Sequence, residues 1–267
     1  MFKYESDSRK VTKGQTFVAL KGMTVDGHDF IDSAIKNGAS HIICEKDIDV
    51  SVPYTKVENT DTYLREILNK EYGNDINKMK LIGVTGTNGK TTTTSLTYEI
   101  VSHAFPGRTH LAGNIGFPLC EVLPNIKEND YLVMEIGVPQ LHDFYDFNPD
   151  IAVLTNIYEA HLDMFGTREY YNENKLRIFQ NHTSKNIAII NKGNEDAYRI
   201  TKDIKSTKKY FTSKEVIDGA YLKDNKIYYY DEEIIDTRDI KLQGNHNYEN
   251  IMAALAKITL VKKKAFN

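Results

Sequence analysis

The segment Gly86-Thr87-Asn88-Gly89-Lys90-Thr91-Thr92 constrains the fold of this chain more than any other feature. It follows an apolar run, Lys80–Val84, that is typical of a buried strand, and it opens a helix-like stretch that extends from Thr91 to about His103. A glycine-rich turn between a strand and a helix directs backbone N–H groups and the positive end of the helix dipole at one point. We therefore expect a β–loop–α unit whose loop binds a polyphosphate.

Two side chains of this loop add the chemistry that a nucleotide site requires. Lys90 can reach the outer phosphates, and the Thr91 hydroxyl can ligate the accompanying Mg²⁺. The spacing departs from the strict G-x-x-x-x-G-K pattern, because Val84 stands where the first glycine belongs. A short Gly-Lys-Thr string also occurs in structural turns, so the prediction depends on the strand–turn–helix context. The residues that we expect to contact the nucleotide are Gly86, Thr87, Asn88, Gly89, Lys90, Thr91 and Thr92.

Length and charge narrow the class of protein. The 267 residues are enough for one large or two moderate domains, and a net charge of −3 does not favour an electrostatic nucleic-acid binder. Apolar runs such as Ile187–Ile190 are too short to cross a bilayer, and Met1–Glu5 lacks the apolar core of a signal peptide. We therefore expect a cytoplasmic protein, with Cys44 and Cys120 as buried thiols and Lys262–Lys264 as a solvated tail.

Residues 1–79 have the pattern of a small α/β domain. Strand candidates at Thr16–Leu20 and His41–Cys44 flank a helix candidate near Phe30–Lys36. Gly38 lies just past that helix, where a C-terminal glycine belongs. The polar segment Gly73–Lys78 then reads as a linker to the next domain.

In residues 80–267, apolar strands alternate with helices. The expected strands are Leu81–Val84, Tyr131–Ile136, Ile151–Asn156 and Asn186–Asn191, and the expected helices are Thr91–His103, Glu169–Phe179 and Tyr248–Lys257. Such alternation is typical of a mostly parallel sheet covered by helices. The stretch Ala220–Asp236 differs, because its tyrosine and isoleucine runs indicate short antiparallel strands. The predicted fold is α/β, with a small N-terminal domain and a central, mostly parallel-sheet domain.

Polar side chains follow the expected strands of the second domain. Ligands of an open parallel sheet gather beyond the carboxyl ends of its strands, where Glu135 and Asn156 fall. A carboxylate beside a nucleotide loop is well placed to hold Mg²⁺, which prefers oxygen ligands. Three polar residues follow Asn156, namely Glu159, His161 and Asp163. From the residues alone, His161 is a ligand of a second metal, a phosphate contact or, as the favoured interpretation, a packed or solvated loop histidine.

Other polar residues have no role that the pattern alone can assign. Lys175 falls on an expected helix, where a lysine usually faces solvent. Asn247 and Asn250 open another helix and are either ordinary caps or amides that face a base.

Taken in order, several segments resemble the Mur ligases, which are ATP-dependent amino-acid ligases of peptidoglycan precursor synthesis. The segments that carry the resemblance are Asp7-Ser8-Arg9-Lys10-Val11, Asp26-Gly27-His28-Asp29-Phe30, Gly86–Thr92, Ala112–Leu119, Tyr171–Phe179 and Leu242–Asn250. The first two are similar to the uridine-nucleotide-binding N-terminal domain of the diamino-acid-adding and D-Ala-D-Ala-adding members. The resemblance implies that residues 1–79 bind a UDP-sugar, that residues 80–267 bind ATP, and that the family's C-terminal amino-acid-binding domain is missing.

The resemblance also implies roles for individual residues. Lys90, Thr91 and the loop backbone would hold ATP, with Thr91 and Glu135 on a first Mg²⁺ and His161 on a second, which reverses the earlier interpretation of that histidine. Lys175 matches a lysine that is carbamylated in many relatives and so becomes an oxygen ligand near a metal. The remaining matches place Asn247 and Asn250 at the adenine, Asn114 at the phosphates or metal, and Ser8 and Arg9 at the uridine nucleotide.

The implied reaction is ligation through an acyl phosphate, with UDP-N-acetylmuramoyl-peptide, an amino acid and ATP as substrates. Two positions depart from the family pattern and concern which substrate is used. Ala160 stands where D-glutamate- and diamino-acid-adding members carry aspartate, and Gly137-Val138 replaces their Ser-Ser pair. Gln140-Leu141 and the His246–Tyr248 segment look most like the D-glutamate-adding ligase, which we favour for the amino acid. The alternatives are a diamino-acid- or D-Ala-D-Ala-adding ligase, a folylpolyglutamate synthetase, and a non-catalytic nucleotide- or UDP-sugar-binding module. A separate chain could supply the third domain.

Overall fold

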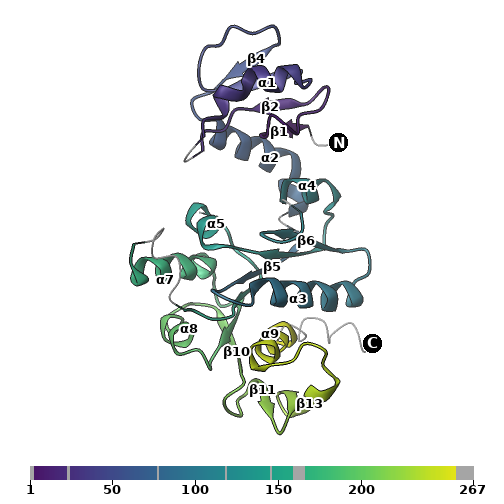
Figure 1. Ribbon diagram of the computed structural model, residues 1–267, viewed down its shortest axis with the longest axis vertical. Coiled ribbons are helices and arrows are strands. Elements are labelled where there is room, and N and C mark those ends of the chain that lie inside the picture. The colour runs from purple at the N-terminus through teal and green to yellow at the C-terminus, as the bar shows by residue number, and fades with distance from the viewer. Residues whose placement is uncertain are drawn as a thin grey trace. The chain divides into compact units, whose positions relative to one another are not determined.

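The computed structural model describes residues 3–22, 25–76, 78–117, 119–144, 146–158 and 166–256. The chain forms two compact units, one of residues 1–77 with 123–125 and one of residues 78–122 with 126–267. Within the described ranges, no helix combines the length and the apolar content that crossing a membrane requires. The predicted α/β class is confirmed in both units (Figure 1).

The N-terminal unit is a four-stranded parallel sheet with helices on both faces. Its strands β1 (Tyr4–Glu5), β2 (Thr16–Val18), β3 (His41–Cys44) and β4 (Tyr54–Lys56) lie in that order. A 3-10 turn, η1 (Gly27–Phe30), leads into α1 (Ile31–Lys36), and α2 spans Thr60–Ile76. Because neighbouring strand residues face opposite sides, Phe17 packs with α1 while Val18 packs with α2. The expected thiol Cys44 is buried in the first of these two cores.

The prediction of a linker at Gly73–Lys78 is wrong, because helix α2 continues through Ile76. The helix starts where the Asn59 side chain accepts a hydrogen bond from the Thr62 amide, 2.8 Å away. Its first half is anchored by apolar side chains such as Leu64 and Ile67, which pack on the sheet. Once a helix is nucleated, each added residue contributes a backbone hydrogen bond, so polar residues extend it without further apolar contact.

The second unit contains a nine-stranded sheet in the order β13-β12-β11-β10-β9-β8-β5-β7-β6. The strands are β5 (Lys80–Thr85), β6 (Thr109–Gly113), β7 (Tyr131–Glu135), β8 (Ile151–Leu154), β9 (Ile187–Asn191), β10 (Thr207–Thr212), β11 (Gly219–Lys223), β12 (Lys226–Tyr229) and β13 (Glu232–Asp236). All pairings from β6 to β11 are parallel, whereas β11, β12 and β13 pair antiparallel. The predicted strands and the antiparallel stretch are confirmed, while β6 and β10 were not predicted.

Helices cover this sheet on both faces. The longer ones are α3 (Lys90–Ala104), α7 (Arg168–Leu176) and α9 (Asn245–Leu255), and the shorter ones are α4 (Leu119–Val122), α5 (Val138–Asp143), η3 (Arg177–Phe179), α8 (Glu195–Ile200) and η4 (Thr237–Asp239). The 3-10 turn η2 (Leu123–Asn125) belongs to the N-terminal unit. Helices α3 and α9 share one apolar core with the sheet face of Ile82 and Val84 (Figure 1). On the opposite face, Gly83 lies against Ile136 and Ile178.

The strand order creates a switch point at β5. The chain leaves β5 through α3 and returns in β6 on one side, whereas β8 pairs with β5 on the other. In register, Val84 lies beside Glu135 of β7, and Thr85 lies beside Leu154 of β8. Crevices for ligands form at such points, beyond the carboxyl ends of the strands. The glycine-rich loop therefore stands between the ends of β7 and β8.

Candidate nucleotide site

Two glycines give the loop after β5 its shape. Gly86 has φ +153° and Gly89 has φ +76°, both in regions that favour glycine. A Cβ atom on Gly86 would lie 1.9 Å from the Thr155 Oγ1 atom, and one on Gly89 would lie 2.2 Å from the Asn250 Oδ1 atom. The backbone thus approaches β8 and α9 more closely than any side chain would allow.

The side chain of Asn156 holds this loop against the end of β8. Its Oδ1 accepts from the Asn88 amide at 2.8 Å, and its Nδ2 donates to the Asn88 carbonyl at 3.0 Å. The Thr155 hydroxyl donates to the same carbonyl at 2.8 Å, and the Thr87 amide donates to the Asn156 carbonyl at 3.0 Å. Two amides of the predicted phosphate loop are therefore already bonded to Asn156, just past the end of β8. The backbone N–H groups that remain to bind an anion are those from Gly89 through the first turn of α3, because the first N–H groups of a helix have no acceptor within the helix.

The lysine of the loop folds back over it. Lys90 Nζ donates to the Thr87 carbonyl at 3.1 Å, which keeps the ammonium group at the loop. Gly89 is the N-cap of α3 and provides no side chain to the first amides of the helix. Thr91 and Thr92 follow on this first turn, with Thr91 exposed to solvent. A cation and free helical amides at one point suit an anion.

Lys175 is buried directly beneath the loop, contrary to what is usual for a lysine on a helix. Only 1% of its surface is exposed, and its Nζ donates to the Gly86 carbonyl at 2.5 Å. The ammonium also lies 5.2 Å from the centre of the Tyr171 ring. Burial, together with the nearby charge of Lys90, lowers the pKa of Lys175 well below its usual value. Tyr171 and Lys175 are four residues apart and therefore share the buried face of α7.

A buried carboxylate ends the neighbouring strand. Glu135 is 1% exposed, and its Oε1 accepts from the Asn114 Nδ2 at 3.0 Å. Its Oε2 has no hydrogen-bond partner among the described residues. An unpaired buried carboxylate oxygen is costly unless a cation or donor occupies the space beside it. Together with the Thr91 hydroxyl, this oxygen is a donor set of the kind that Mg²⁺ takes.

The predicted second-metal ligand cannot be placed. His161 and its neighbours Glu159 and Asp163 lie outside the described residues. Within the described ranges, no three histidine, cysteine, aspartate or glutamate side chains are grouped as a metal-binding cluster.

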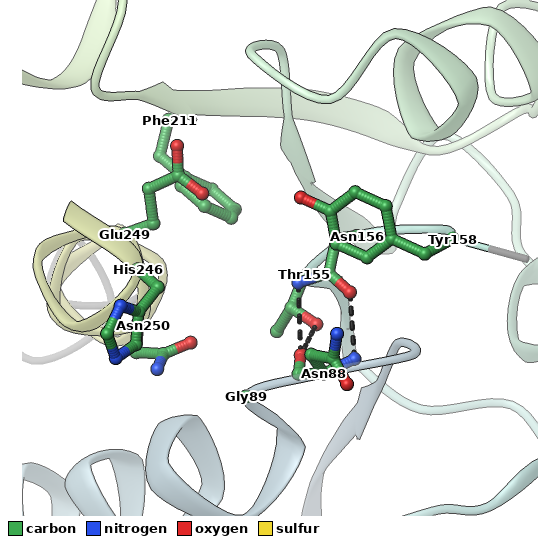
Figure 2. A pocket seen from close by; sticks show the side chains of 9 residues that line it. All are labelled: Asn88, Gly89, Thr155, Asn156, Tyr158, Phe211, His246, Glu249 and Asn250. Carbon is green, nitrogen blue, oxygen red and sulfur yellow. Dashed lines mark hydrogen bonds between the residues drawn. The ribbon is translucent and has the colours of Figure 1, made fainter. Parts of the chain in front are cut away.

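A pocket of about 470 Å³ opens beside the loop, on the side of helix α9 (Figure 2). The residues that line it are Asn88, Gly89, Thr155, Asn156, Tyr158, Phe211, His246, Glu249 and Asn250. Sequence reasoning did not assign Tyr158, Phe211 or Glu249 to a site. Phe211 lies on β10, which was not predicted, and neither Tyr158 nor Glu249 belongs to a pattern that indicates a ligand.

The two predicted adenine contacts differ in their positions. Asn250 lines the pocket, and its Oδ1 accepts from the buried hydroxyl of Thr93 on α3 at 3.2 Å. Asn247 is not among the lining residues; its Nδ2 donates to the Gln243 carbonyl at 2.9 Å. Helix α9 begins at Asn245, three residues before the predicted start, so both asparagines lie within its first two turns.

The two predicted uridine contacts lie in the N-terminal unit. Ser8 is buried, and its carbonyl accepts from the Asn37 side chain at 2.8 Å. Arg9 is exposed, and its guanidinium donates two hydrogen bonds to the Asp7 carboxylate while its backbone amide donates a third; these bonds lower the pKa of that carboxyl to about 2.

Comparison with known proteins identifies the family. Residues 84–258 match the model of the Mur ligase middle domain, and residues 4–78 match that of the Mur ligase family catalytic domain. The UDP-N-acetylmuramoylalanine–D-glutamate ligase of Bacillus cereus strain G9842 is 42% identical over 184 residues, which are 68% of this chain and 40% of that protein. The corresponding ligase of Macrococcus caseolyticus is 41% identical over 211 residues, which are 77% of this chain and 46% of that protein.

Solved structures agree with this result. The MurF ligase of Thermotoga maritima in complex with ADP superposes with a TM-score of 0.74 at 27% identity, over 97% of this chain and 63% of that one. MurF of Acinetobacter baumannii has the same fold, with a TM-score of 0.77 at 24% identity, over 97% of this chain and 59% of that one. The chain spans less than half the length of the curated relatives it matches. Because the middle-domain model alone covers more than half of the sequence, the chain belongs to the Mur ligase family.

Proposed function

We propose that this chain carries the ATP-binding and UDP-sugar-binding parts of a ligase that adds D-glutamate to a UDP-N-acetylmuramoyl-peptide in peptidoglycan precursor synthesis. The observation that carries the proposal is the convergence of three groups at the β5 switch point. These groups are the glycine-rich loop with Lys90, the unpaired carboxylate oxygen of Glu135 and the buried amine of Lys175. Membership of the Mur ligase family supports the reaction class, and the D-glutamate-adding relatives support the amino acid.

In this proposal the loop and its lysine bind the polyphosphate of ATP. The first amides of α3 would contact the phosphates, and the Lys90 ammonium would approach the outer ones. Glu135 and Thr91 would hold Mg²⁺, and His161 would contribute to a second ion. Bound Mg²⁺ would neutralise charge on the transferred phosphoryl group. Asn114 would orient the Glu135 carboxylate through its 3.0 Å hydrogen bond, and Asn250 would form a wall of the adenine pocket.

The proposed reaction has two steps. In the first, a carboxylate oxygen of the UDP-N-acetylmuramoyl-peptide forms a bond to the γ-phosphorus of ATP, while the bond from that phosphorus to the β,γ-bridging oxygen breaks and ADP leaves. In the second, the amine of the amino acid forms a C–N bond at the acyl carbon. The C–O bond to phosphate breaks, inorganic phosphate leaves, and the amine loses a proton. Positioning and electrostatics dominate the first step, which the loop and Lys90 would provide.

The environment of Lys175 is compatible with carbamylation. Only a neutral amine attacks CO₂, and burial next to Lys90 shifts the pKa of Lys175 in that direction. Formation of the N–C bond and loss of a proton would replace a buried cation by a carboxylate-like group. We expect Lys175→Ala to lose ligase activity and to recover part of it with added acetate. Full activity of the untreated variant would refute the carbamate.

The function is tested by titrating the chain with ATP–Mg²⁺ and with UDP-N-acetylmuramoyl-L-alanine, followed by a phosphate-release assay with candidate amino acids. We expect both ligands to bind, and phosphate release to depend on D-glutamate. Failure to bind the UDP-sugar would remove the assignment to this pathway. Binding of both ligands without phosphate release for any amino acid would favour a non-catalytic binding module, and release with another amino acid would change only the specificity.

A further inference from the structure

The carboxylate of Glu249 lines the pocket at a distance from the phosphate loop. It accepts from the Asn191 Nδ2 at 3.0 Å and from the Ser213 hydroxyl at 2.6 Å, groups at the ends of β9 and β10. In the sheet, β10 is three positions from β5, which at the usual strand spacing is about 14 Å. Figure 2 shows Glu249 and Phe211 across the pocket from Asn88 and Gly89. Glu249 therefore belongs to the end of the pocket that is remote from the phosphates.

This position is electrostatically consistent with a bound nucleotide. A carboxylate close to a polyphosphate would repel it, and the repulsion weakens with distance. Between the loop and Glu249 the pocket wall is formed by uncharged groups, including Asn250 and Thr155. In the proposed nucleotide site, Glu249 would therefore face the uncharged nucleoside. Phe211 lines the same side of the pocket (Figure 2), where its ring is 1% exposed and packs into the apolar core of the sheet.

The carboxylate has unused capacity to accept hydrogen bonds. An ionised carboxylate only accepts, and each of its oxygens has two lone pairs. Among the residues that the structure describes, each oxygen of Glu249 accepts from one donor, Asn191 Nδ2 for Oε2 and Ser213 Oγ for Oε1. One further lone pair therefore remains on each oxygen for a donor in the pocket. A ligand atom that is itself an acceptor would be repelled there.

We infer that Glu249 selects the base of the nucleotide, by accepting a hydrogen bond from the exocyclic amino group of a 6-aminopurine. A 6-oxopurine presents an acceptor at the same position and would be rejected. The inference rests on the proposed nucleotide site and specifies how that site distinguishes ATP from other purine nucleotides. Asn191 acts as the positioning residue, because its Nδ2 donates to the carboxylate at 3.0 Å.

The test is an equilibrium titration of the 267-residue chain with ADP, IDP and 2′-deoxy-ADP in the presence of Mg²⁺. IDP carries oxygen in place of the 6-amino group, and 2′-deoxy-ADP lacks one ribose donor. We expect the wild type to bind ADP roughly 10- to 100-fold more tightly than IDP, and to bind 2′-deoxy-ADP within about threefold of ADP. In Glu249→Gln, whose side-chain amide can both donate and accept, the preference for ADP over IDP should nearly disappear.

Ser213→Ala is the matched control, because it removes one contact of the carboxylate and leaves the carboxylate itself. Glutamine at position 249 can present its oxygen to the Asn191 Nδ2 and its amino group to the Ser213 hydroxyl, which is able to accept, so both variants should fold, as thermal unfolding would show. We expect Ser213→Ala to keep the preference for ADP. An equal loss of preference in both variants would overturn the inference and make Glu249 a clamp between α9 and the sheet.

Two other results would also overturn the inference. An unchanged ADP-to-IDP ratio in Glu249→Gln would remove the role in base selection, and an altered ratio for 2′-deoxy-ADP alone would assign Glu249 to the ribose. In both cases ADP still binds, so the proposed function stands. Absence of ADP binding by the wild type would instead remove the nucleotide site and this inference together.

Discussion

Asn156 is the residue whose replacement tests the architecture of the loop most sharply. Its side chain makes two hydrogen bonds to the backbone of Asn88, at 2.8 and 3.0 Å. A side-chain hydrogen bond contributes about 0.5–1.5 kcal/mol net, and these two are accessible to water, so about 1–2 kcal/mol is lost in Asn156→Ala. If the loop must be ordered before it binds phosphate, this loss appears as a weaker affinity. A change of 1–2 kcal/mol corresponds to about a 5- to 30-fold higher Kd for ADP.

Calorimetric titration with ADP and Mg²⁺ measures this effect, and two further variants calibrate it. Asn156→Asp should bind still more weakly, because an oxygen would face the Asn88 carbonyl and add negative charge beside the phosphates. Asn186→Ala removes a larger set of side-chain bonds at the amino end of β9, to the amide and hydroxyl of Thr183, to the Asn148 side chain and to the Pro149 carbonyl. It should lower the thermal stability and leave the ADP affinity unchanged. An Asn156→Ala variant that binds ADP within about twofold of the wild type would refute the reasoning.

Three more results are expected. Lys90→Ala should weaken ADP binding by more than about 30-fold in the same titration. The far-ultraviolet circular dichroism spectrum should be unchanged, because in the described structure the Lys90 amine contacts only a nearby carbonyl. An unchanged affinity would count against the site. Gly89→Ala should abolish ADP binding, because its Cβ would lie 2.2 Å from the Asn250 Oδ1 and the residue has φ +76°. Gly107 has a similar φ of +71° but open space around it, so Gly107→Ala should cost about 1–2 kcal/mol of stability and leave binding intact. Equal effects of the two variants on binding would contradict this prediction. Burial lowers the pKa of His182 to about 4. Between pH 6.5 and 4 the unfolded chain therefore takes up a proton that the folded chain does not, and the free energy of unfolding should fall by about 3 kcal/mol across this range. Denaturant titrations should show a smaller decline in His182→Gln, and equal slopes would refute the assignment.

Local patterns were sufficient to predict the core of the second unit. The strand Leu81–Val84, the helix from Thr91 and the strands near Tyr131 and Ile151 carry signals within a few residues, namely apolar runs and a glycine turn. The order of these elements implied a parallel sheet, and hence that Glu135 would lie near the loop.

What sequence reasoning missed depends on contacts between distant segments. Nothing in the helix pattern around Lys175 indicates that its ammonium is buried under Gly86, 89 residues earlier in the chain. Glu249 and Phe211 meet in one pocket only because β10 and α9 are brought together by the sheet order. The end of helix α2 was not predicted, because a glycine and several polar residues in its second half are typical of a linker.

The central claim is that the turn from Gly86 to Lys90 binds the phosphates of ATP. It is tested most directly by a crystal structure of the chain with a non-hydrolysable ATP analogue and Mg²⁺. We predict phosphate oxygens within hydrogen-bond distance of the first amides of α3 and of Lys90 Nζ, with the base between α9 and the end of β8. A nucleotide bound elsewhere, with this turn empty, would contradict the account.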